Sequence, residues 1–257
     1  MPTISLARAR AELIAAGITG PHQSHSRDNV VKKIRSLLGP EPDETFGISD
    51  LGAYGDSEVL GFLADITGCW RDVQDCEGYD QIDPDKTIEG IVAMGNLVRD
   101  AAIRGATLVC ATGHPTGMLE CYMRIVQSFR RAGGKVLRPR EREDIPWKGS
   151  KIRQITYVGG VGMWSDWGNL LHTHSAHPME AMLTGTTWPD LVLGDHGFAG
   201  AAIERGIPTI AIMDINDIAF AIASARGHDV TLVPLDDNRP PAFYEPVWTL
   251  VEEILEG

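Results

Sequence analysis

Short, continuously apolar runs recur along the chain from residue 107 onward. LVCAT, LVLG, TIAIM and VTLVP have the character of buried parallel strands, and the segments between them carry helical periodicity. The predicted strands are 107–112, 135–138, 152–158, 191–194, 208–213 and 230–235. The predicted helices are 87–104, 117–132, 178–184, 198–205, 217–226 and 245–256. This alternation predicts an α/β fold with a Rossmann-like, mostly parallel sheet and helices on both faces.

The first 85 residues follow a different pattern. Helices are predicted at 5–16 and 28–38, and an apolar helical patch at 58–66 lies among long loops rich in Gly, Asp and Pro. Ser26 or Asp28 is placed to cap the second helix. We therefore expect a helical and loop-rich N-terminal region.

The length of the chain favours a single domain. We expect one α/β domain over 1–257, with the N-terminal region at 1–85 and a parallel-sheet core at 86–257. The charged stretch at 138–151 interrupts that core. It is expected to be exposed, either as a surface loop or as a lid whose arginines reach an anionic ligand.

Four polar clusters stand where predicted strands end. They are GHPTG at 113–117, LHTHSAHP at 171–178, GDHGFAG at 194–200 and MDIND at 213–217. The carboxyl ends of parallel strands form the ligand crevice of an open α/β sheet. We therefore expect the four clusters to form one site.

The GHPTG cluster has the character of an anion-binding turn. Gly113 and Gly117 allow backbone N–H groups to approach an anion closely, and the following helix N-terminus adds about half a positive charge. His114 and Thr116 are placed to contact phosphate oxygens; the alternative is a plain turn in which Thr116 caps the helix. The spacing is neither GxxxxGK[ST] nor GxGxxG, which argues against nucleoside triphosphates and NAD.

The histidine row adds side chains that can bind a metal, transfer protons or hold phosphate. Alternate residues of an extended segment face the same way, so His172 and His174 are expected to project together, with His177 nearby. The turn VGGVGMWSD at 158–166 is a second glycine-rich candidate. The predicted phosphate-binding residues are Gly113, His114, Thr116, Gly117, Gly159, Gly160, Ser175, Gly197 and Asn216.

Carboxylates follow two of the predicted strands. Asp195 ends an almost wholly apolar run, and a carboxylate buried there needs a cation, backbone amides or a histidine as partner, unless it serves as a helix N-cap. Asp214 and Asp217 follow the next strand, where Asn216 or Asp217 is an alternative cap. Oxygen ligands at strand ends suit Mg²⁺, so Asp195, Asp214 and Asp217 are the predicted metal ligands.

Charge and composition narrow the classes of partner. The net charge of −12 and the pI near 5.1 disfavour a nucleic-acid polymer or an anionic membrane, because both require a positive surface. The chain has no apolar stretch of about 18 residues and no signal-peptide core, so a cytoplasmic location is expected. The four cysteines lack CxxC spacing and are expected to be buried and without chemistry. A homodimer is common among acidic α/β proteins of this size.

Six motifs together resemble a family of bacterial, largely actinobacterial phosphatases. They are GHPTG, YVGGVGMW, HTHSAHPMEAML, GDHGFAGAA, DIND and VPLDDNRPP, and the similarity covers most of the chain, including LARARAELIAAGITG near its start. The resemblance implies a phosphomonoesterase. This chain has Phe198 and Ile218 where the related sequences read DHGWAGAA and NDP. Both residues are expected to face the packed interior, where the differences alter the shape of the pocket more than its chemistry.

The expected reaction is hydrolysis of a small phosphate monoester, either a nucleotide or a sugar phosphate. The chain has no RHG and no CX5R motif, which argues against two common phosphatase mechanisms. Glycine-rich turns and helix N-termini are expected to hold the phosphate, while a histidine acts as nucleophile or proton donor. The candidate catalytic residues are Asp195, His196, His174 and His172, with His114 as a further proton-transferring candidate. The N-terminal region offers Asp28, Asn29, Lys32, Lys33 and Asp56, either as further site residues or as surface positions.

Two other classes of function stay open. A non-hydrolytic sugar-phosphate or nucleotide binding protein, or an isomerase, would use the same anion-binding turns without cleavage. A metal-dependent lyase or hydrolase acting on a non-phosphorylated ligand would hold a transition metal through His172, His174 and Asp195.

Overall fold

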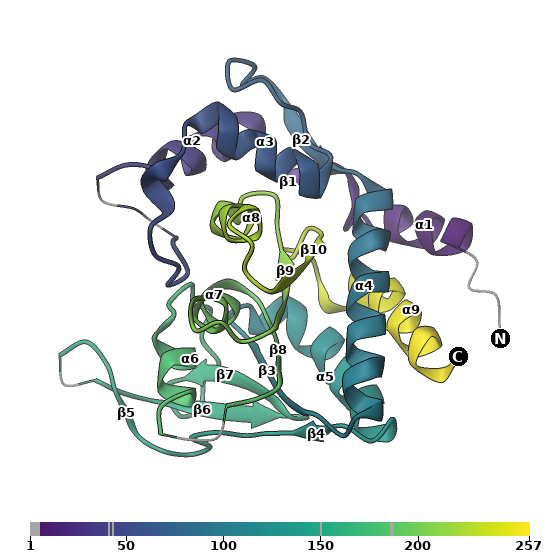
Figure 1. The fold of residues 1–257 in the computed structure, drawn as a ribbon, viewed down its shortest axis with the longest axis vertical. Coiled ribbons are helices and arrows are strands. Elements are labelled where there is room, and N and C mark those ends of the chain that lie inside the picture. The colour runs from purple at the N-terminus through teal and green to yellow at the C-terminus, as the bar shows by residue number, and fades with distance from the viewer. Residues whose placement is uncertain (1–5, 41, 43, 150, 186–187) are drawn as a thin grey trace.

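A mostly parallel sheet runs through the centre of the molecule, seen in the computed structural model of Figure 1. The structure describes residues 6–40, 42, 44–149, 151–185 and 188–257. The strands of this sheet are β3 (Thr107–Thr112), β4 (Lys135–Val136), β5 (Ile145–Pro146), β6 (Ile152–Val158), β7 (Val161–Ser165), β8 (Leu191–Gly194), β9 (Thr209–Met213) and β10 (Val230–Pro234). Their order is β10–β9–β8–β3–β7–β6–β5, with β4 paired to β3. The five strands from β10 to β7 are parallel, whereas β6 pairs antiparallel with β7, and β5 antiparallel with β6.

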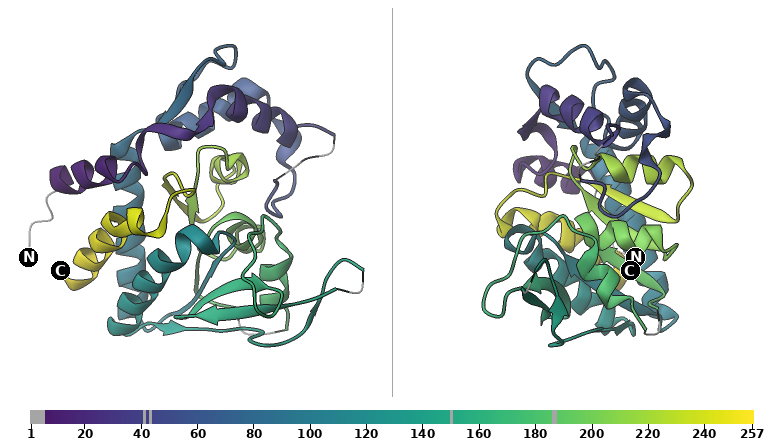
Figure 2. Two further views of the ribbon diagram at one scale, coloured as in Figure 1. Left: turned by 180° about the vertical axis from the view of Figure 1, so that it is seen from behind. Right: turned by 90° about the vertical axis from the view of Figure 1, so that its left-hand side faces the viewer.

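Helices cover both faces of the sheet, as the alternating pattern predicts (Figure 2). Successive side chains of a strand point to opposite faces. Leu108 and Cys110 of β3 therefore join one core, and Val109 and Ala111 join another. The first core contains α1 (Leu6–Ala15), α4 (Pro84–Ile103), α5 (Pro115–Arg131) and α9 (Glu245–Glu256). The second contains α6 (His177–Met182) and α7 (His196–Glu204).

The N-terminal region packs against the β9 side of the sheet. Its helices α2 (Arg27–Leu37) and α3 (Asp56–Thr67) share a core with β9 and α8 (Ile218–Ala225). A two-stranded antiparallel ribbon, β1 (Gly20–Ser26) with β2 (Tyr79–Ile82), runs beside them. Two 3-10 turns, η1 (Leu51–Ala53) and η2 (Pro241–Tyr244), complete the elements. The region stands across the top of the sheet in Figure 1.

The chain changes direction across the sheet at β3. After β3 it builds β6 and β7 on one side, and it then crosses to build β8, β9 and β10 on the other. Ligands of open α/β sheets bind outside the carboxyl ends of the strands at such a switch point. The fold therefore places the candidate site at the ends of β3 and β8.

Most of the predicted core elements are confirmed, and four strands were missed: β1, β2, β5 and β7. The bounds of β3, β6 and β8 agree with the predicted ranges, and Ser26 caps α2 by accepting a hydrogen bond from Asn29 N at 3.2 Å. The prediction of a glycine-rich turn over 158–166 was wrong, because only Gly159 and Gly160 turn and the chain then returns as β7. The ribbon of β1 and β2 was also missed, since GPHQSHS and YDQI lack the apolar alternation that marks a strand.

None of the helices in the described part of the chain is both long enough and apolar enough to cross a membrane.

The charged stretch at 138–151 is paired within itself. Arg138 lies 3.6 Å from the Glu141 carboxylate, and Arg140 lies 2.9 Å from that of Glu143. Both arginines pair with carboxylates of the same stretch, which favours the surface-loop alternative.

Candidate functional site

Asp195 joins the two strands on either side of the switch point. It follows β8, and its carboxylate accepts hydrogen bonds from Gly113 N at 2.6 Å and from Thr112 Oγ1 at 2.5 Å, both at the end of β3. It occupies the N-cap position of α7 without making a side-chain capping bond. The N-cap alternative was therefore wrong, whereas the expectation that a buried Asp195 needs a polar partner is confirmed.

The histidine row is held against the turn that follows β3. Thr173 N donates a hydrogen bond to Gly113 O at 2.9 Å. A Cβ atom at Gly113 would lie 2.2 Å from Thr173 O, far inside van der Waals contact. Gly113 is needed for this close backbone approach, which places the row beside the β3–α5 turn.

Four imidazoles form one cluster at this edge of the sheet. The ring centroids of His174 and His196 are 4.3 Å apart, and those of His114 and His172 are 4.6 Å apart. Nε2 of His172 lies 2.9 Å from Nε2 of His174, so these two side chains project together as their alternate spacing predicts. Three separate strand ends, those of β3, β7 and β8, thus supply the histidine cluster, which consists of His114, His172, His174 and His196.

His196 has an unusual backbone conformation. It is the first residue of α7, its φ is +41°, and its side chain is buried. A residue with a Cβ atom rarely adopts positive φ, and such strain is common at functional sites. Gly197 follows directly, and a Cβ there would lie 2.2 Å from the backbone of Ser175. The turn from β8 into α7 therefore aims His196 into the cluster while passing close to the histidine row.

Asp237 is a site residue that the sequence analysis missed. It follows β10, it is buried, and its Oδ2 lies 3.3 Å from Nε2 of His196 and 3.5 Å from Nδ1 of His114. The signal was present, because LDDN is a fifth polar cluster directly after an apolar strand. Asp237 links two histidines that come from different strand ends.

The carboxylate of Asp237 sets the charge of the cluster. Burial lowers the pKa of His196, but the neighbouring carboxylates, Asp237 foremost, outweigh burial and raise it to about 10. At His114, burial likewise lowers the pKa and Asp237 raises it. The net result is a pKa above the ordinary value. The pKa of His172 is instead lowered to about 4, first by burial and then by the other imidazoles. Asp237 thus favours the cationic form of both imidazoles that it contacts.

Other buried carboxylates lie at the same edge. Asp217 Oδ2 accepts a hydrogen bond from Asp214 N at 2.9 Å, while Asp214 Oδ1 accepts one from Ile215 N at 2.6 Å. Burial raises the pKa of Asp195 and that of Asp217. Asn216, between the two aspartates, is half-buried.

The predicted magnesium ligands Asp195, Asp214 and Asp217 do not gather as one set. Among the described residues, the groups whose ligand atoms all lie within 4.8 Å of one another are His172 with His174 and His196, and His114 with His196 and Asp237. The carboxylate oxygens of Asp195 are bonded to the end of β3 instead. A magnesium requirement stays a prediction, and the structure offers nitrogen-rich alternatives.

The N-terminal region reaches the cluster at positions other than those predicted. His25 Nε2 lies 3.2 Å from Asp214 Oδ2, and Ser24 Oγ donates to Asp236 Oδ2 at 2.6 Å. Glu44 Oε1 lies 3.3 Å from Nδ1 of His174, and Phe46 packs against the same ring. Figure 1 shows the loop that carries Glu44 and Phe46 descending beside α7.

The residues predicted from the N-terminal region have mostly local partners. Asp28 pairs with Lys32 one helical turn away, and Asp56 lies 3.4 Å from Arg35. Lys33 is the exception, because its Nζ lies 2.5 Å from the Glu44 carboxylate, and Glu44 in turn contacts His174.

Gly159 and Gly160 lie away from the cluster. They form the turn between β6 and β7, and the antiparallel return of the chain places that turn at the opposite end of β7 from the histidine row. A Cβ at Gly159 would meet Met123, and one at Gly160 would meet Arg130, both far along α5 from its start. The prediction that these glycines join the phosphate-binding turns is therefore corrected.

The remaining predicted residues lie around the cluster in different ways. Gly117 packs closely against the segment after β10, since a Cβ there would lie 3.0 Å from Asp237 O, while Thr116 is exposed. Ser175 is half-buried, and its Oγ accepts a hydrogen bond from His177 N at 3.3 Å. The ring of His177 packs outside the cluster, with its centroid 5.2 Å from that of Trp147.

The stretch DPDKT at 83–87 matches the DxDx(T/V) pattern of one class of phosphatase, but it lies elsewhere. Asp83 caps α4 by accepting from Asp85 N at 2.9 Å, and Asp85 pairs with Arg10 at the surface. Thr87 Oγ1 bonds to Pro234 O at 2.8 Å. This stretch begins a helix and does not follow a strand of the main sheet, so it serves as a cap.

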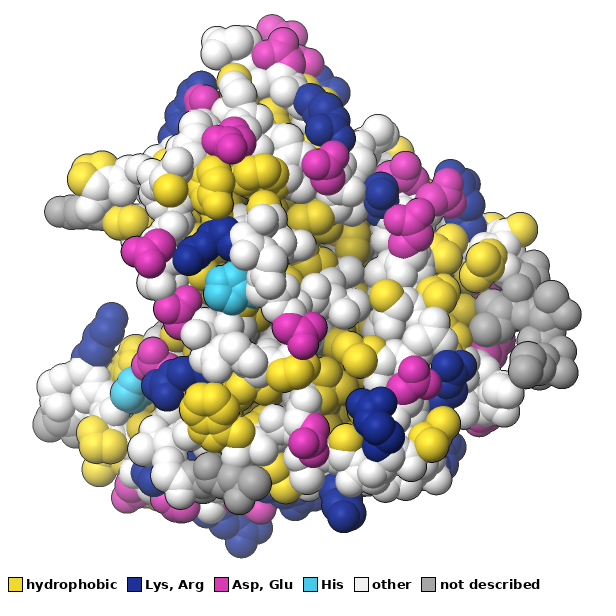
Figure 3. Space-filling model, viewed as in Figure 1, with side chains coloured by type: hydrophobic (Ala, Val, Ile, Leu, Met, Phe, Trp, Pro, Cys, Tyr) yellow, Lys and Arg dark blue, Asp and Glu magenta, His cyan; other side chains and the backbone are white. Residues whose placement is uncertain are grey.

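The surface is hollowed beside the cluster. Figure 3 shows an indentation on the left, between the N-terminal region above and the segment around β5 below. Both segments contact the histidine row. Glu44 of the upper segment lies beside His174, and the carbonyl oxygen of Pro146 in the lower segment lies 3.2 Å from Nε2 of His177. The indentation therefore lies between two segments that both contact the row.

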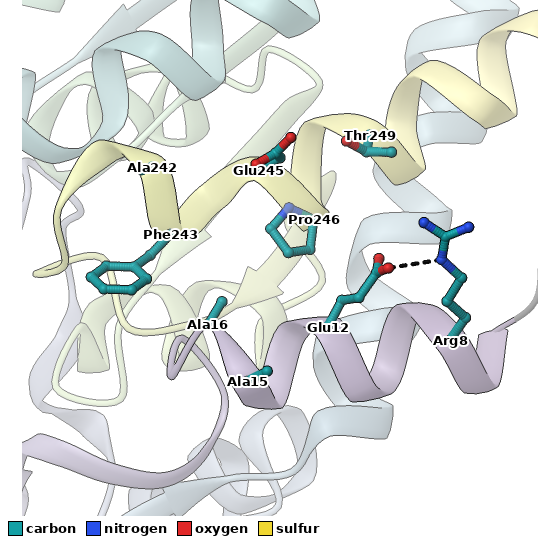
Figure 4. Close-up of a pocket in the computed structure, with 9 residues that line it drawn as sticks. All are labelled: Arg8, Glu12, Ala15, Ala16, Ala242, Phe243, Glu245, Pro246 and Thr249. Carbon is teal, nitrogen blue, oxygen red and sulfur yellow. Dashed lines mark hydrogen bonds and ion pairs between the residues drawn. The ribbon is translucent and has the colours of Figure 1, made fainter.

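A second depression has a different character. It lies between α1 and the segment of η2 and α9, has a volume of about 450 Å³ and is drawn in Figure 4. Its charged groups include Arg8 and Glu12, which pair with each other at 2.7 Å. No histidine is among the described residues that line it. The histidine cluster is therefore the stronger candidate for catalysis.

Comparison with known proteins agrees with the resemblance of the motifs. The model of the Phosphatase family matches residues 4–255. The chain is 32% identical over 257 residues to Phosphatase SCO2771 of Streptomyces coelicolor, an alignment that covers 95% of this chain and 94% of that protein. The match spans all the strand ends that build the cluster. The chain therefore belongs to the Phosphatase family.

Proposed function

We propose that this protein hydrolyses monoesters of small phosphorylated metabolites at the histidine cluster. The observation that carries the proposal is the position of Asp237 between His114 and His196, at the carboxyl edge of the parallel strands. An edge of this kind is where open α/β sheets bind ligands. Family membership supports a phosphatase, and the meeting of several strand ends at the cluster supports this location for its chemistry.

Positive charge for the phosphate comes from two sources in this arrangement. The helices α5 and α7 both begin at the cluster, and a helix N-terminus offers unpaired N–H groups and about half a positive charge. His114 adds a group whose positive form Asp237 favours, because that carboxylate raises its pKa. Together they offset the acidic charge of the protein at the point where the phosphate binds.

The reaction needs one proton for the leaving group and one attacking water. Water attacks phosphorus and forms the new P–O bond, and the P–O bond to the alcohol breaks with its electron pair on the alcohol oxygen. His114 is the group that we assign as proton donor to that oxygen, because Asp237 orients its ring. The water returns one proton to the site through an imidazole and keeps the other on the product phosphate. The products are the free alcohol and hydrogen phosphate.

The N-terminal region supports a small substrate. His25, Ser24 and Glu44 contact residues that follow β9, β10 and β7, so this region lies over three of the strand ends. A long polymer would have to displace these contacts to reach the cluster. We therefore expect nucleoside monophosphates or sugar phosphates as substrates.

The test is phosphate release from p-nitrophenyl phosphate and from a panel of nucleoside monophosphates and sugar phosphates. The native protein is compared with His114→Ala and with the control His177→Ala, whose side chain faces Trp147. We expect the first variant to lose about 100-fold or more in kcat and the control to keep its activity.

The comparison compound is bis(p-nitrophenyl) phosphate, a diester with the same leaving group. Faster hydrolysis of the diester than of the monoester would contradict the monoester assignment. Folded protein that releases phosphate from none of the esters would instead favour a non-hydrolytic binding protein or an isomerase.

A further inference from the structure

Three of the clustered imidazoles are arranged as the ligands of one metal ion. One ring nitrogen from each of His172, His174 and His196 lies within 4.8 Å of the other two, and Nε2 of His172 is 2.9 Å from Nε2 of His174. Two nitrogens bound tetrahedrally to zinc at about 2.0–2.1 Å lie about 3.3 Å apart. The three nitrogens are therefore already gathered on one side of the cluster, close to the separations that a shared zinc ion needs.

Carboxylates hold the outer side of two of these rings. Nδ1 of His174 lies 3.3 Å from Glu44 Oε1, which leaves its Nε2 facing His172. Nε2 of His196 lies 3.3 Å from Asp237 Oδ2, while its buried Nδ1 lies 3.7 Å from Asp195 Oδ1 and makes no hydrogen bond among the described residues. Histidines that bind a metal commonly donate the other ring N–H to a carboxylate, which fixes the ring and raises its basicity.

Backbone contacts position the three histidines. The Thr173–Gly113 hydrogen bond fixes the segment between His172 and His174. The positive φ of His196 and the tight contact of Gly197 with Ser175 fix the third ring. A preformed set of ligands is expected where an ion is bound in the folded state.

We propose that His172, His174 and His196 form a zinc site. Imidazole nitrogen suits zinc and other late divalent metals, whereas magnesium prefers oxygen ligands and near-octahedral geometry. Three protein ligands leave a fourth position open, as in catalytic zinc sites, and His172 is exposed to solvent. The sequence analysis gave His172, His174 and Asp195 as possible transition-metal ligands. In the proposed site, His196 takes the place of Asp195. What the ion does in hydrolysis rests on the proposed function, since the open position would take a phosphate oxygen or a water molecule.

The test measures zinc binding by the whole protein and does not depend on catalysis. Protein stripped of metal with a chelator is titrated with ZnCl₂ in competition with a chromogenic chelator. We expect one equivalent to bind, and His172→Ala and His174→Ala each to weaken binding by about 100-fold or more. His177→Ala, from the same row but outside the cluster, is expected to bind like the native protein. His172 is exposed, so its loss is not expected to unfold the chain.

Cobalt gives a second readout of the same site. Co²⁺ in a four-coordinate site rich in nitrogen absorbs visible light more strongly than hexaaqua Co²⁺, and this absorption should be absent from His172→Ala. The inference is overturned if folded protein binds no zinc, or if His172→Ala and His174→Ala bind it as the native protein does. Zinc binding with this mutational pattern, combined with no ester hydrolysis, would support the site and count against the proposed function.

Discussion

The carboxylate of Asp237 lies 3.3 Å from Nε2 of His196. Asp237 follows β10 at one edge of the sheet, and His196 opens the helix after β8, two strands away. The contact spans the end of β9 and ties the outer strand to the switch point. It also supplies negative charge that raises the pKa of a buried imidazole.

Asp237→Asn should lower kcat for ester hydrolysis by about 100-fold or more at neutral pH. The amide keeps the shape of the side chain but removes the charge, so burial is expected to lower the pKa of His196 and of His114. Steady-state kinetics measures the loss, and the ring-proton shifts of the histidines over a pH series measure the change in pKa. Asp229→Asn, at an exposed position between β9 and β10, is the matched control. Unchanged kinetics in Asp237→Asn would remove this residue from the proposed chemistry.

Glu44→Gln should weaken zinc binding by about 10-fold to 100-fold. The glutamine keeps most of the volume but loses the negative charge that faces Nδ1 of His174, and outer partners of metal ligands typically have effects of this size. The competition titration with ZnCl₂ measures it. Glu204→Gln is the control, because Glu204 ties the same loop to α7 through Ser49 without touching a histidine. Equal losses in both variants would indicate that loop docking, and not the Glu44 charge, governs the effect.

Gly113→Ala should destabilise the protein by about 3 kcal/mol or more and lower its Tm by about 6–12 °C. The added Cβ would lie 2.2 Å from the carbonyl oxygen of Thr173, and a backbone atom held by hydrogen bonding does not move aside cheaply. Thermal unfolding monitored by circular dichroism measures the change.

The control for this substitution is Gly61→Ala in α3, where nothing lies within 4 Å of the new Cβ. Alanine is favoured over glycine in a helix by about 1 kcal/mol, so Gly61→Ala should raise the Tm. A Gly113→Ala protein as stable as the native chain would show that the row can move away from the turn.

Thiol reagents should modify the native protein mainly at Cys76. Cys69, Cys110 and Cys121 are buried, and burial raises the pKa of Cys69 to about 12 and also raises the other two. A chromogenic disulfide reagent at pH 8 should therefore titrate one thiol quickly, and all four after unfolding in guanidinium. Rapid reaction of three or four thiols in the folded protein would contradict the burial of these side chains.

The same thiols predict a fall in stability at alkaline pH. Unfolding returns each buried thiol to an ordinary pKa near 9.0, so above that pH the unfolded chain releases protons that the native protein keeps. The free energy of unfolding should therefore decline as the pH rises from 9 toward 12. Denaturant unfolding of native protein and of Cys69→Ala over this range measures the contribution, and the variant should show a shallower decline.

The sequence by itself determined the features that depend on neighbouring residues. The apolar run at 107–112 is a buried strand. Ser26 caps the helix α2, which begins at the next residue. His172 and His174 project together because alternate residues of an extended segment share a side. The polar clusters after the strands mark the ligand edge, because parallel strands end at the same edge of a sheet.

Only the tertiary structure decided which of these side chains meet. Asp195 bonds to the end of β3 across 82 and 83 residues of sequence, a pairing created by the crossover at the switch point. Asp237 reaches His196 because β10, β9 and β8 are neighbours in the sheet, and Glu44 reaches His174 because the N-terminal loop packs on α7. Local periodicity reports whether a residue is buried, whereas contact between distant strand ends depends on strand order and on the packing of the whole chain.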